Sequence, residues 1–158
     1  MPIHRSMTLD GIDRAILAWL QRDALMTGDA LAEKIGRSPS VIARRIRRLR
    51  AEGVIERDTA ILRPDLTGYP FTTLVKIYLQ RHETEESGKL RRRLQAEPRV
   101  QLMLDIAGEL DMVLLVVSRD MADYDAFADA TLEASPAVRR FESHVVKKRH
   151  KADYTIPL

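Results

Sequence analysis

The stretch RSPSVIARRIRRLR, residues 37–50, decides how the N-terminal part of the chain folds. Its second and third residues, Ser38 and Pro39, are a helix-capping residue and a proline at the first helical position. Apolar residues then recur at i, i+4 and i+7, namely Ile42, Ile46 and Leu49. This spacing predicts an amphipathic helix, which Gly53 ends. The stretch holds six arginines and no acid, whereas a merely solvated helix usually mixes both signs of charge.

Two further helices are predicted before this one. Asp10 caps the first, with Asp13 at the third helical position as in a capping box, and helical spacing continues to Arg22. Thr27 caps the second, and Gly36 ends it. Two helices joined by a short turn that contains glycine, here the second and third, are typical of a helix-turn-helix.

The outer face of the third helix is the candidate nucleic-acid contact. It has no acid to repel phosphate, and arginine binds guanine through two hydrogen bonds. Serines at the start of the helix can donate to phosphate, where the helix dipole favours anions. Arg45 lies nearer the apolar stripe, so it contacts either DNA or the protein's own helices. Double-stranded DNA is the predicted partner, through Arg37, Ser38, Ser40, Val41, Arg44, Arg45, Arg47 and Arg48.

The composition supports this placement of charge. The chain has 158 residues, 45% hydrophobic and 31% charged, which is typical of a globular protein. The net charge of +3 lies entirely within residues 1–62. The absence of cysteine excludes disulfides and thiolate metal sites. No apolar run approaches the roughly 20 residues of a membrane helix, and residues 1–6 lack a signal core, so a cytoplasmic location without membrane contact is expected.

Two β-prone pieces, Val54-Ile55 and residues 60–62, predict a small hairpin after the third helix. Such a wing either touches the DNA backbone or covers the helical core. Pro64, Gly68 and Pro70 then mark a linker. We expect a helix-turn-helix domain over residues 9–62, a linker over 63–70, a second domain over 71–150 and a tail over 151–158.

The second domain is predicted to be a ferredoxin-like βαββαβ fold, so the chain is of the α+β class. Strands are expected over residues 71–80, 99–107, 112–118 and 141–148, and helices over 84–97 and 123–134. Both helices cover one face of an antiparallel sheet. The other face is expected to expose an apolar patch that soluble monomers avoid, formed by Met103, Val113, Leu115 and Val117. A second copy of the chain is therefore expected to cover it, giving a homo-oligomer.

The ordered set of short motifs in this chain resembles the Lrp/AsnC, or feast/famine, family of prokaryotic transcription regulators. These motifs are LDGIDRAIL (9–17), ALA (30–32), SPS (38–40), RIRRL (45–49), GVI (53–55), Gly68, GELD (108–111) and IPL (156–158). The resemblance implies a DNA-binding winged helix-turn-helix and an effector-binding C-terminal domain of the RAM/AsnC type. It also implies a homodimer formed through the sheet, and often a tetramer of dimers.

The resemblance further implies that a free amino acid binds between dimers as the effector. It assigns the effector site to Gly108, Glu109, Leu110, Asp111 and Ser143. A glycine lets a ligand approach backbone N–H groups, and a carboxylate pairs with an α-ammonium group. Family members commonly have an aromatic residue at the position of Leu110 and a threonine at that of Ser143. Taken without the family, Gly-x-x-Asp between two strands is an ordinary tight turn.

Two other classes of function share this two-domain layout or part of it. One is an enzyme that resembles siroheme decarboxylases, and the other is an effector-binding module that acts through protein contacts. His82, His144 and His150 follow no catalytic pattern, and we find no phosphate loop, nucleophile elbow or metal-ligand spacing. We therefore predict a regulator without catalytic residues, metal or cofactor.

Overall fold

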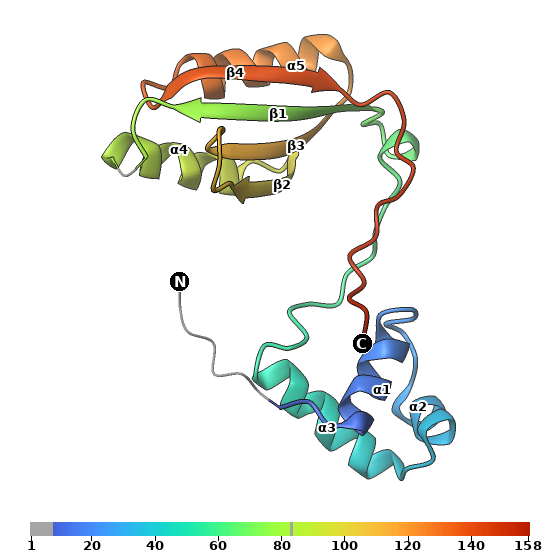
Figure 1. Cartoon of the computed structure of the whole chain (residues 1–158). Coiled ribbons are helices and arrows are strands. Elements are labelled where there is room, and N and C mark those ends of the chain that lie inside the picture. The colour runs from blue at the N-terminus through green and yellow to red at the C-terminus, as the bar shows by residue number, and fades with distance from the viewer. Residues whose placement is uncertain (1–7, 83) are drawn as a thin grey trace. The chain divides into compact units, whose positions relative to one another are not determined.

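The computed structural model describes residues 8–82 and 84–158, and these form two compact units (Figure 1). The first, which we call the head, contains the described residues up to Ile61 together with Ala152–Leu158. The second, which we call the sheet domain, is Leu62–Lys151. Residues 1–6, from which the lack of a secretion signal was inferred, lie outside the described part of the chain. No helix among the described residues is long and apolar enough to cross a membrane.

Three helices build the head: α1 (Gly11–Leu20), α2 (Gly28–Ile35) and α3 (Pro39–Ala51). The predicted capping signals are confirmed. Asp10 accepts hydrogen bonds from the backbone N–H groups of Ile12 and Asp13, and Thr27 accepts one from Ala30. Gly36 ends α2 with a φ of 68°, a left-handed conformation that favours glycine. The apolar stripes of the helices meet in one core of fully buried side chains: Ile16, Leu31, Ile42 and Leu49.

The hairpin predicted after α3 is wrong. No strand forms between residues 53 and 63, all of which are described. The backbone N–H groups of Val54 and Ile55 donate instead to the carbonyl of Leu49, 2.9 and 3.2 Å away, and so satisfy the end of α3. At the expected tip, Asp58 pairs with Arg50 at 2.8 Å. The first β-prone piece therefore completes the end of α3 instead of pairing with the second.

The last residues of the chain belong to the head. Gln21, the residue that ends α1, binds both backbone polar groups of Ile156 with its side-chain amide. Its Nε2 donates to the Ile156 carbonyl at 3.1 Å, and its Oε1 accepts from the Ile156 N–H at 2.6 Å. This pairing anchors an extended segment that has no strand partner of its own.

The sheet domain has the predicted βαββαβ order. Its strands are β1 (Phe71–Leu79), β2 (Val100–Asp105), β3 (Met112–Ser118) and β4 (Val138–Val145). Its helices are α4 (Glu85–Ala96) and α5 (Met121–Ala128), with a short 3₁₀ turn before β1, η1 (Pro64–Leu66), and a π-helical turn after α5, η2 (Asp129–Glu133). The strands pair antiparallel in the order β2-β3-β1-β4. The first and third strands in the chain are therefore central, and the second and fourth form the edges.

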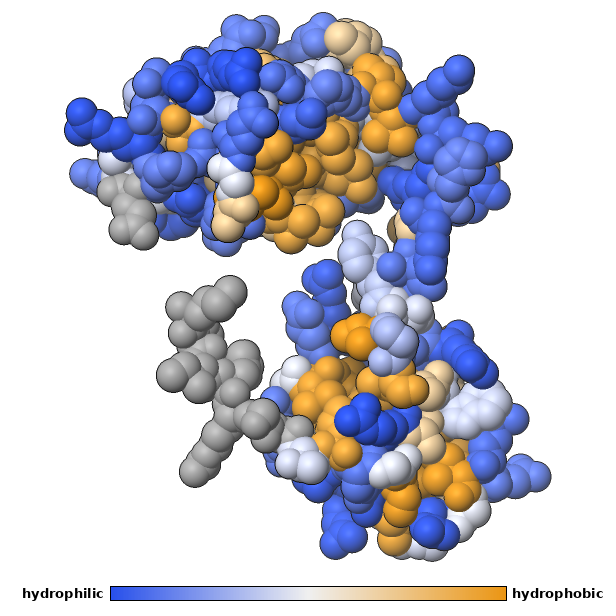
Figure 2. Space-filling model, viewed as in Figure 1, coloured by the Kyte–Doolittle hydropathy of each residue, from blue (hydrophilic) through white to orange (hydrophobic). Residues whose placement is uncertain are grey.

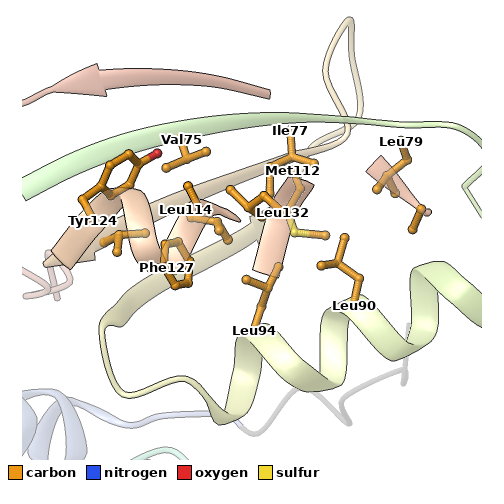
Figure 3. Close-up of a cluster of buried hydrophobic side chains, with 13 residues drawn as sticks. Val75, Ile77, Leu79, Leu90, Leu94, Met112, Leu114, Tyr124, Phe127 and Leu132 are labelled. Carbon is orange, nitrogen blue, oxygen red and sulfur yellow. The ribbon is translucent and has the colours of Figure 1, made fainter. Parts of the chain in front are cut away.

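The core of the sheet domain lies between the sheet and its two helices, as Figure 3 shows. Alternate residues of β1 and β3 point into it, because side chains on a strand alternate between faces. Phe127 of α5 and Leu94 of α4 are fully buried against them. The helix containing Phe127 begins two residues before its predicted start because Asp120 caps it, accepting from the N–H of Asp123 at 2.8 Å.

The open face of the sheet carries a row of leucines across three strands. Leu115 of β3 stands opposite Leu74 of β1 on one side and Leu102 of β2 on the other. Figure 2 shows apolar side chains gathered where β2 and β3 lie. The strand β4, by contrast, brings polar groups to this face, and its Glu142 pairs with Lys76 at 3.8 Å. The apolar part of the open face is therefore centred on β3.

The prediction that Met103 belongs to the open face is wrong. The pairing of β2 with β3 is irregular between Val100 and Leu102, and this shift turns Met103 toward the helices, where it packs on the core. The side chain of its neighbour Leu104 lies on the open face instead and is exposed. Val113 and Leu115 are half-buried there, and Val117 is buried.

Candidate nucleic-acid interface and effector turn

The turn between α2 and α3 places the start of α3 at the surface. Arg37 and Ser38 are exposed, and the backbone N–H of Arg37 donates to the carbonyl of Ala32 at 3.1 Å, which closes the end of α2. The side chain of Ser38 makes no capping bond with the helix, and its hydroxyl lies 3.2 Å from that of Ser40. These two exposed hydroxyls therefore stand together at the N-terminus of α3, where the helix dipole is positive.

Two arginines lie on the exposed side of α3. Arg44 and Arg47 are exposed, and neither forms an ion pair with any carboxylate in the described part of the chain. Val41 is half-buried beside them. The guanidinium of Arg37 donates to the carbonyl of Gly36, at 2.9 Å. The predicted cationic face is thus present on α3, next to the serine hydroxyls.

Arg45 and Arg48 of α3 turn toward α1 instead. Arg45 donates to Asp10 at 2.7 Å and to Asp13 at 2.8 Å, and Arg48 donates to Asp13 at 2.6 Å. The side chain of Asp13 is only 1% exposed. The alternative that sequence reasoning left open for Arg45, a bridge to the protein's own helices, is what its side chain does here. For Arg48 no sequence signal indicated this, because its partner lies 35 residues away.

The same contacts perturb the ionisation of Asp10. The backbone N–H of Asp13 and the guanidinium of Arg45 lower the pKa of the Asp10 carboxyl from 3.8 to about 2. Conversely, hydrogen bonds to Asp10 and then Asp13 raise the pKa of Arg45. The carboxylate form of Asp10 therefore favours the folded head.

We expect Asp10→Asn to flatten the acid dependence of head stability. The folded pKa of Asp10 is below its unfolded value, so the stabilisation is complete above about pH 4 and is lost as the pH falls toward 2. Asparagine still caps α1, so mainly the charge changes. Trp19 in α1 is the only tryptophan and reports unfolding of the head by fluorescence in urea. Glu33→Gln removes an exposed charge from α2 as a control, and an Asp10→Asn variant that keeps the wild-type slope contradicts this assignment.

The predicted effector residues Gly108, Glu109, Leu110 and Asp111 form the connection between β2 and β3. The Ile106 N–H donates to the Asp111 carbonyl at 2.8 Å and closes the turn. Gly108 is exposed, has no positive φ, and a Cβ there would meet only the Ile106 side chain, at 3.8 Å. Neither backbone strain nor packing within the chain therefore requires glycine at this position.

The Asp111 carboxylate is 9% exposed and binds the end of β1. Its Oδ2 accepts from the Leu79 N–H at 2.8 Å, while its backbone N–H donates to the Ile77 carbonyl at 3.1 Å. Its Oδ1 lies 2.5 Å from Nδ1 of the exposed His82. Oδ2 of Asp111 therefore binds the turn to β1, whereas Oδ1 contacts the exposed side chain of His82.

Ser143 is not brought to this turn within one chain. It pairs with Val75, four residues along β1 from Leu79, which corresponds to about 13 Å along a strand. Its hydroxyl forms a hydrogen bond with the hydroxyl of Tyr124. Tyr124 is buried, and burial raises the pKa of its phenol. Among the described residues, no group of three or more His, Asp and Glu side chains is arranged to hold a metal ion.

Both units match known protein families. Residues 72–156 match the Lrp/AsnC ligand binding domain, and residues 9–56 match a winged helix-turn-helix DNA-binding domain. The leucine-responsive regulatory protein of Haemophilus influenzae is 32% identical over 147 residues, which cover 93% of this chain and 89% of that protein. These matches are to regulators and not to enzymes, which leaves the siroheme-decarboxylase alternative without support.

Solved structures agree along almost the full length. An AsnC family transcriptional regulator from Agrobacterium tumefaciens superposes with a TM-score of 0.87 at 30% identity, covering 94% of this chain and 97% of that one. A transcriptional regulator from Neisseria meningitidis, solved as a complex with L-methionine, gives 0.88 at 26% identity, with 95% and 97% covered. The chain therefore belongs to the Lrp/AsnC family of DNA-binding transcriptional regulators.

Proposed function

We propose that this regulator reads the major groove with α3, and that Arg44 supplies the base contact. The observation that carries this proposal is the outward side of α3, where Arg44 and Arg47 have no acidic partner among the described residues. Arginine in this position can bind O6 and N7 of guanine. Arg47 and Arg37 neutralise phosphates, which makes the affinity fall with salt. Arg45 and Arg48 serve the packing of the head.

The start of α3 completes the proposed contact. The hydroxyls of Ser38 and Ser40 donate to a backbone phosphate at the positive end of the helix. Val41, half-buried one turn before Arg44 and Arg45, can touch a thymine methyl group. Phosphate contacts fix the register of the helix on the duplex, whereas base contacts select the sequence.

The oligomer that we propose is a homodimer formed over the open face of the sheet, as the base of larger assemblies. Leu74, Leu102 and Leu115 give this face a continuous apolar row, and each of the three is only half-buried within the chain. A twofold dimer presents two heads, so its operator is an imperfect palindrome with half-sites separated by whole helical turns. The protein works in the cytoplasm, with the chromosome.

The effector in our proposal is a free amino acid bound at the turn formed by residues 108–111. The exposed glycine gives a ligand access to backbone N–H groups, and Asp111 supplies a carboxylate for the α-ammonium group. The relative from Neisseria meningitidis was solved with L-methionine, which makes this amino acid the first one to test. Ser143 can join such a site only from a neighbouring copy, because in its own chain it lies far along β1.

Recovery of genomic DNA fragments by the purified chain tests the proposed regulation. We expect enrichment of a small set of promoter fragments that share a palindromic half-site, and altered occupancy when one member of an amino-acid panel is added. An effector that couples to DNA binding typically changes the affinity by 1–3 kcal/mol, or about 5- to 150-fold. Enrichment of no fragment even at low ionic strength contradicts DNA recognition by α3.

We expect Asp111→Ala to abolish the response to the effector while leaving DNA binding intact, because the head does not contain this residue. The readouts are calorimetric titration with L-methionine, followed by the effective members of the panel, and a gel-shift assay with and without them. Asp111→Asn is the sharper variant, since its amide oxygen still accepts from the Leu79 N–H but the charge is gone.

A matched control distinguishes the specific effect of losing Asp111 from the general effect of losing a negative charge. Asp105→Ala removes another carboxylate of the same strand-turn-strand unit, one that is 59% exposed and pairs with Arg91 at 3.2 Å. This variant is expected to respond like the wild type. An unchanged response in both Asp111 variants removes Asp111 from the effector site.

A further inference from the structure

One buried carboxylate ties the recognition helix of the head to the first helix. Asp13 lies on α1, is 1% exposed, and receives Arg45 on Oδ1 at 2.8 Å and Arg48 on Oδ2 at 2.6 Å. The two arginines are three residues apart, so they leave α3 from the same side. The backbone N–H of Asp10 also donates to Oδ2, at 3.3 Å. Asp13 therefore has an N–H or guanidinium partner for each of its oxygens.

This arrangement fixes the rotation of α3 about its own axis. The apolar residues Ile42 and Leu49 allow α3 to pack on the head, but apolar contact is not directional. Guanidinium–carboxylate hydrogen bonds are directional. The two guanidinium hydrogen bonds to Asp13 hold one side of α3 against α1. Ser40, Arg44 and Arg47 remain exposed.

We infer that Asp13 is a positioning residue for DNA reading: it aims Arg44 at the groove and withholds Arg45 and Arg48 from phosphate. This inference rests on the proposed recognition by α3. The segment 37–50 then offers DNA fewer cations than its six arginines suggest, because Asp13 and Asp10 engage two and Asp58 engages Arg50. With fewer cations free to bind phosphate, affinity for DNA of any sequence is lower. Base contacts then contribute a larger share of the binding energy, so discrimination between sequences increases.

Asp13→Asn is the test, since asparagine has the same shape and no charge. The affinity is measured over a range of salt concentrations for two duplexes of equal length, a fragment that the wild type recovers and a scrambled version. We expect the ratio of specific to non-specific affinity to fall at least tenfold. The plot of log affinity against log salt should steepen by about one to two per head, since each phosphate contact adds about 0.9 to the slope.

Asp58→Asn is the matched control. It removes one negative charge from the head and frees Arg50, another arginine of α3, but its pair is exposed on both sides, at 48% and 42%. Its affinity for both duplexes is expected to rise together, with the ratio within about twofold of the wild type. The inference is overturned if Asp13→Asn and Asp58→Asn change the ratio of specific to non-specific affinity by the same factor. A wild type that binds neither duplex rejects instead the proposed recognition on which the inference rests.

Arg45→Met keeps the inference testable if Asp13→Asn does not fold. Methionine retains apolar bulk in place of the arginine stem and removes one of the two links from α3 to Asp13. We expect the specificity ratio to fall while the salt slope stays within about half a unit per head. A slope that drops by about one per head, with the ratio unchanged, shows that Arg45 contacts phosphate directly and overturns the positioning role.

Discussion

Leu115→Glu is expected to convert the protein into a monomer of 18.0 kDa that no longer holds its operator. Leu115 lies in the middle of the leucine row on the open face, flanked by Leu74 and Leu102 on the two neighbouring strands. A second copy seated on this row surrounds a glutamate there with apolar side chains. Burying an unpaired carboxylate costs several kcal/mol, and each 1.4 kcal/mol weakens association tenfold.

Loss of the dimer also removes the advantage of two linked heads. Linked sites typically bind 10²- to 10⁴-fold more tightly than either site alone, so operator affinity is expected to fall by about 100-fold or more. Light scattering after gel filtration measures the mass, and fluorescence anisotropy with a labelled operator measures the affinity. Ala126→Glu adds the same charge to the exposed side of α5 and should change neither. A Leu115→Glu protein of wild-type mass contradicts the proposed interface.

The fold followed from the sequence wherever a local signal was sufficient. Capping by Asp10 and Thr27, and the αL glycine at 36, depend only on residues within one turn of the helix, so the starts of α1 and α2 and the end of α2 agree with the structure. Phe127 and Leu132, both within the helix expected over residues 123–134, are buried in the core. Met103 was misplaced because the irregular pairing near Val100 reverses which face a residue takes, and periodicity alone does not reveal it.

The candidate site was harder to predict, because its decisive contacts are between distant residues. The helical spacing of residues 37–50 predicts an outer cationic face, and Arg44 and Arg47 are exposed there, but this spacing does not show that α1 presents a carboxylate to Arg48. The sequence pattern indicates only one role for Asp13, helix capping. Its second role, pairing with Arg45 and Arg48 of α3, depends on the tertiary structure. Asp10 and Asp13 stand three residues apart at the start of the first helix, but the sequence does not show that Arg45 and Arg48 of α3 reach them.

Arg44→Ala is expected to reduce binding to the operator by about 10- to 100-fold per head, while binding to scrambled DNA falls only slightly. The side chain is exposed and makes no ion pair within the described residues, so its removal breaks none of the ion pairs that hold the head together. The expected loss corresponds to the 1–3 kcal/mol that one bidentate contact with guanine contributes to discrimination. Anisotropy titrations with both duplexes at one salt concentration give the ratio.

Arg14→Ala serves as the matched control, because it removes an arginine that is also exposed but lies on α1 rather than α3. Its effect should be small and the same for both duplexes, as expected for a change in the general field of the head. If Arg44→Ala weakens both duplexes equally, Arg44 binds phosphate and not a base. Base selection would then rest on Arg47 and Val41, and substituting guanine in the half-site, position by position, would identify which of them reads the sequence.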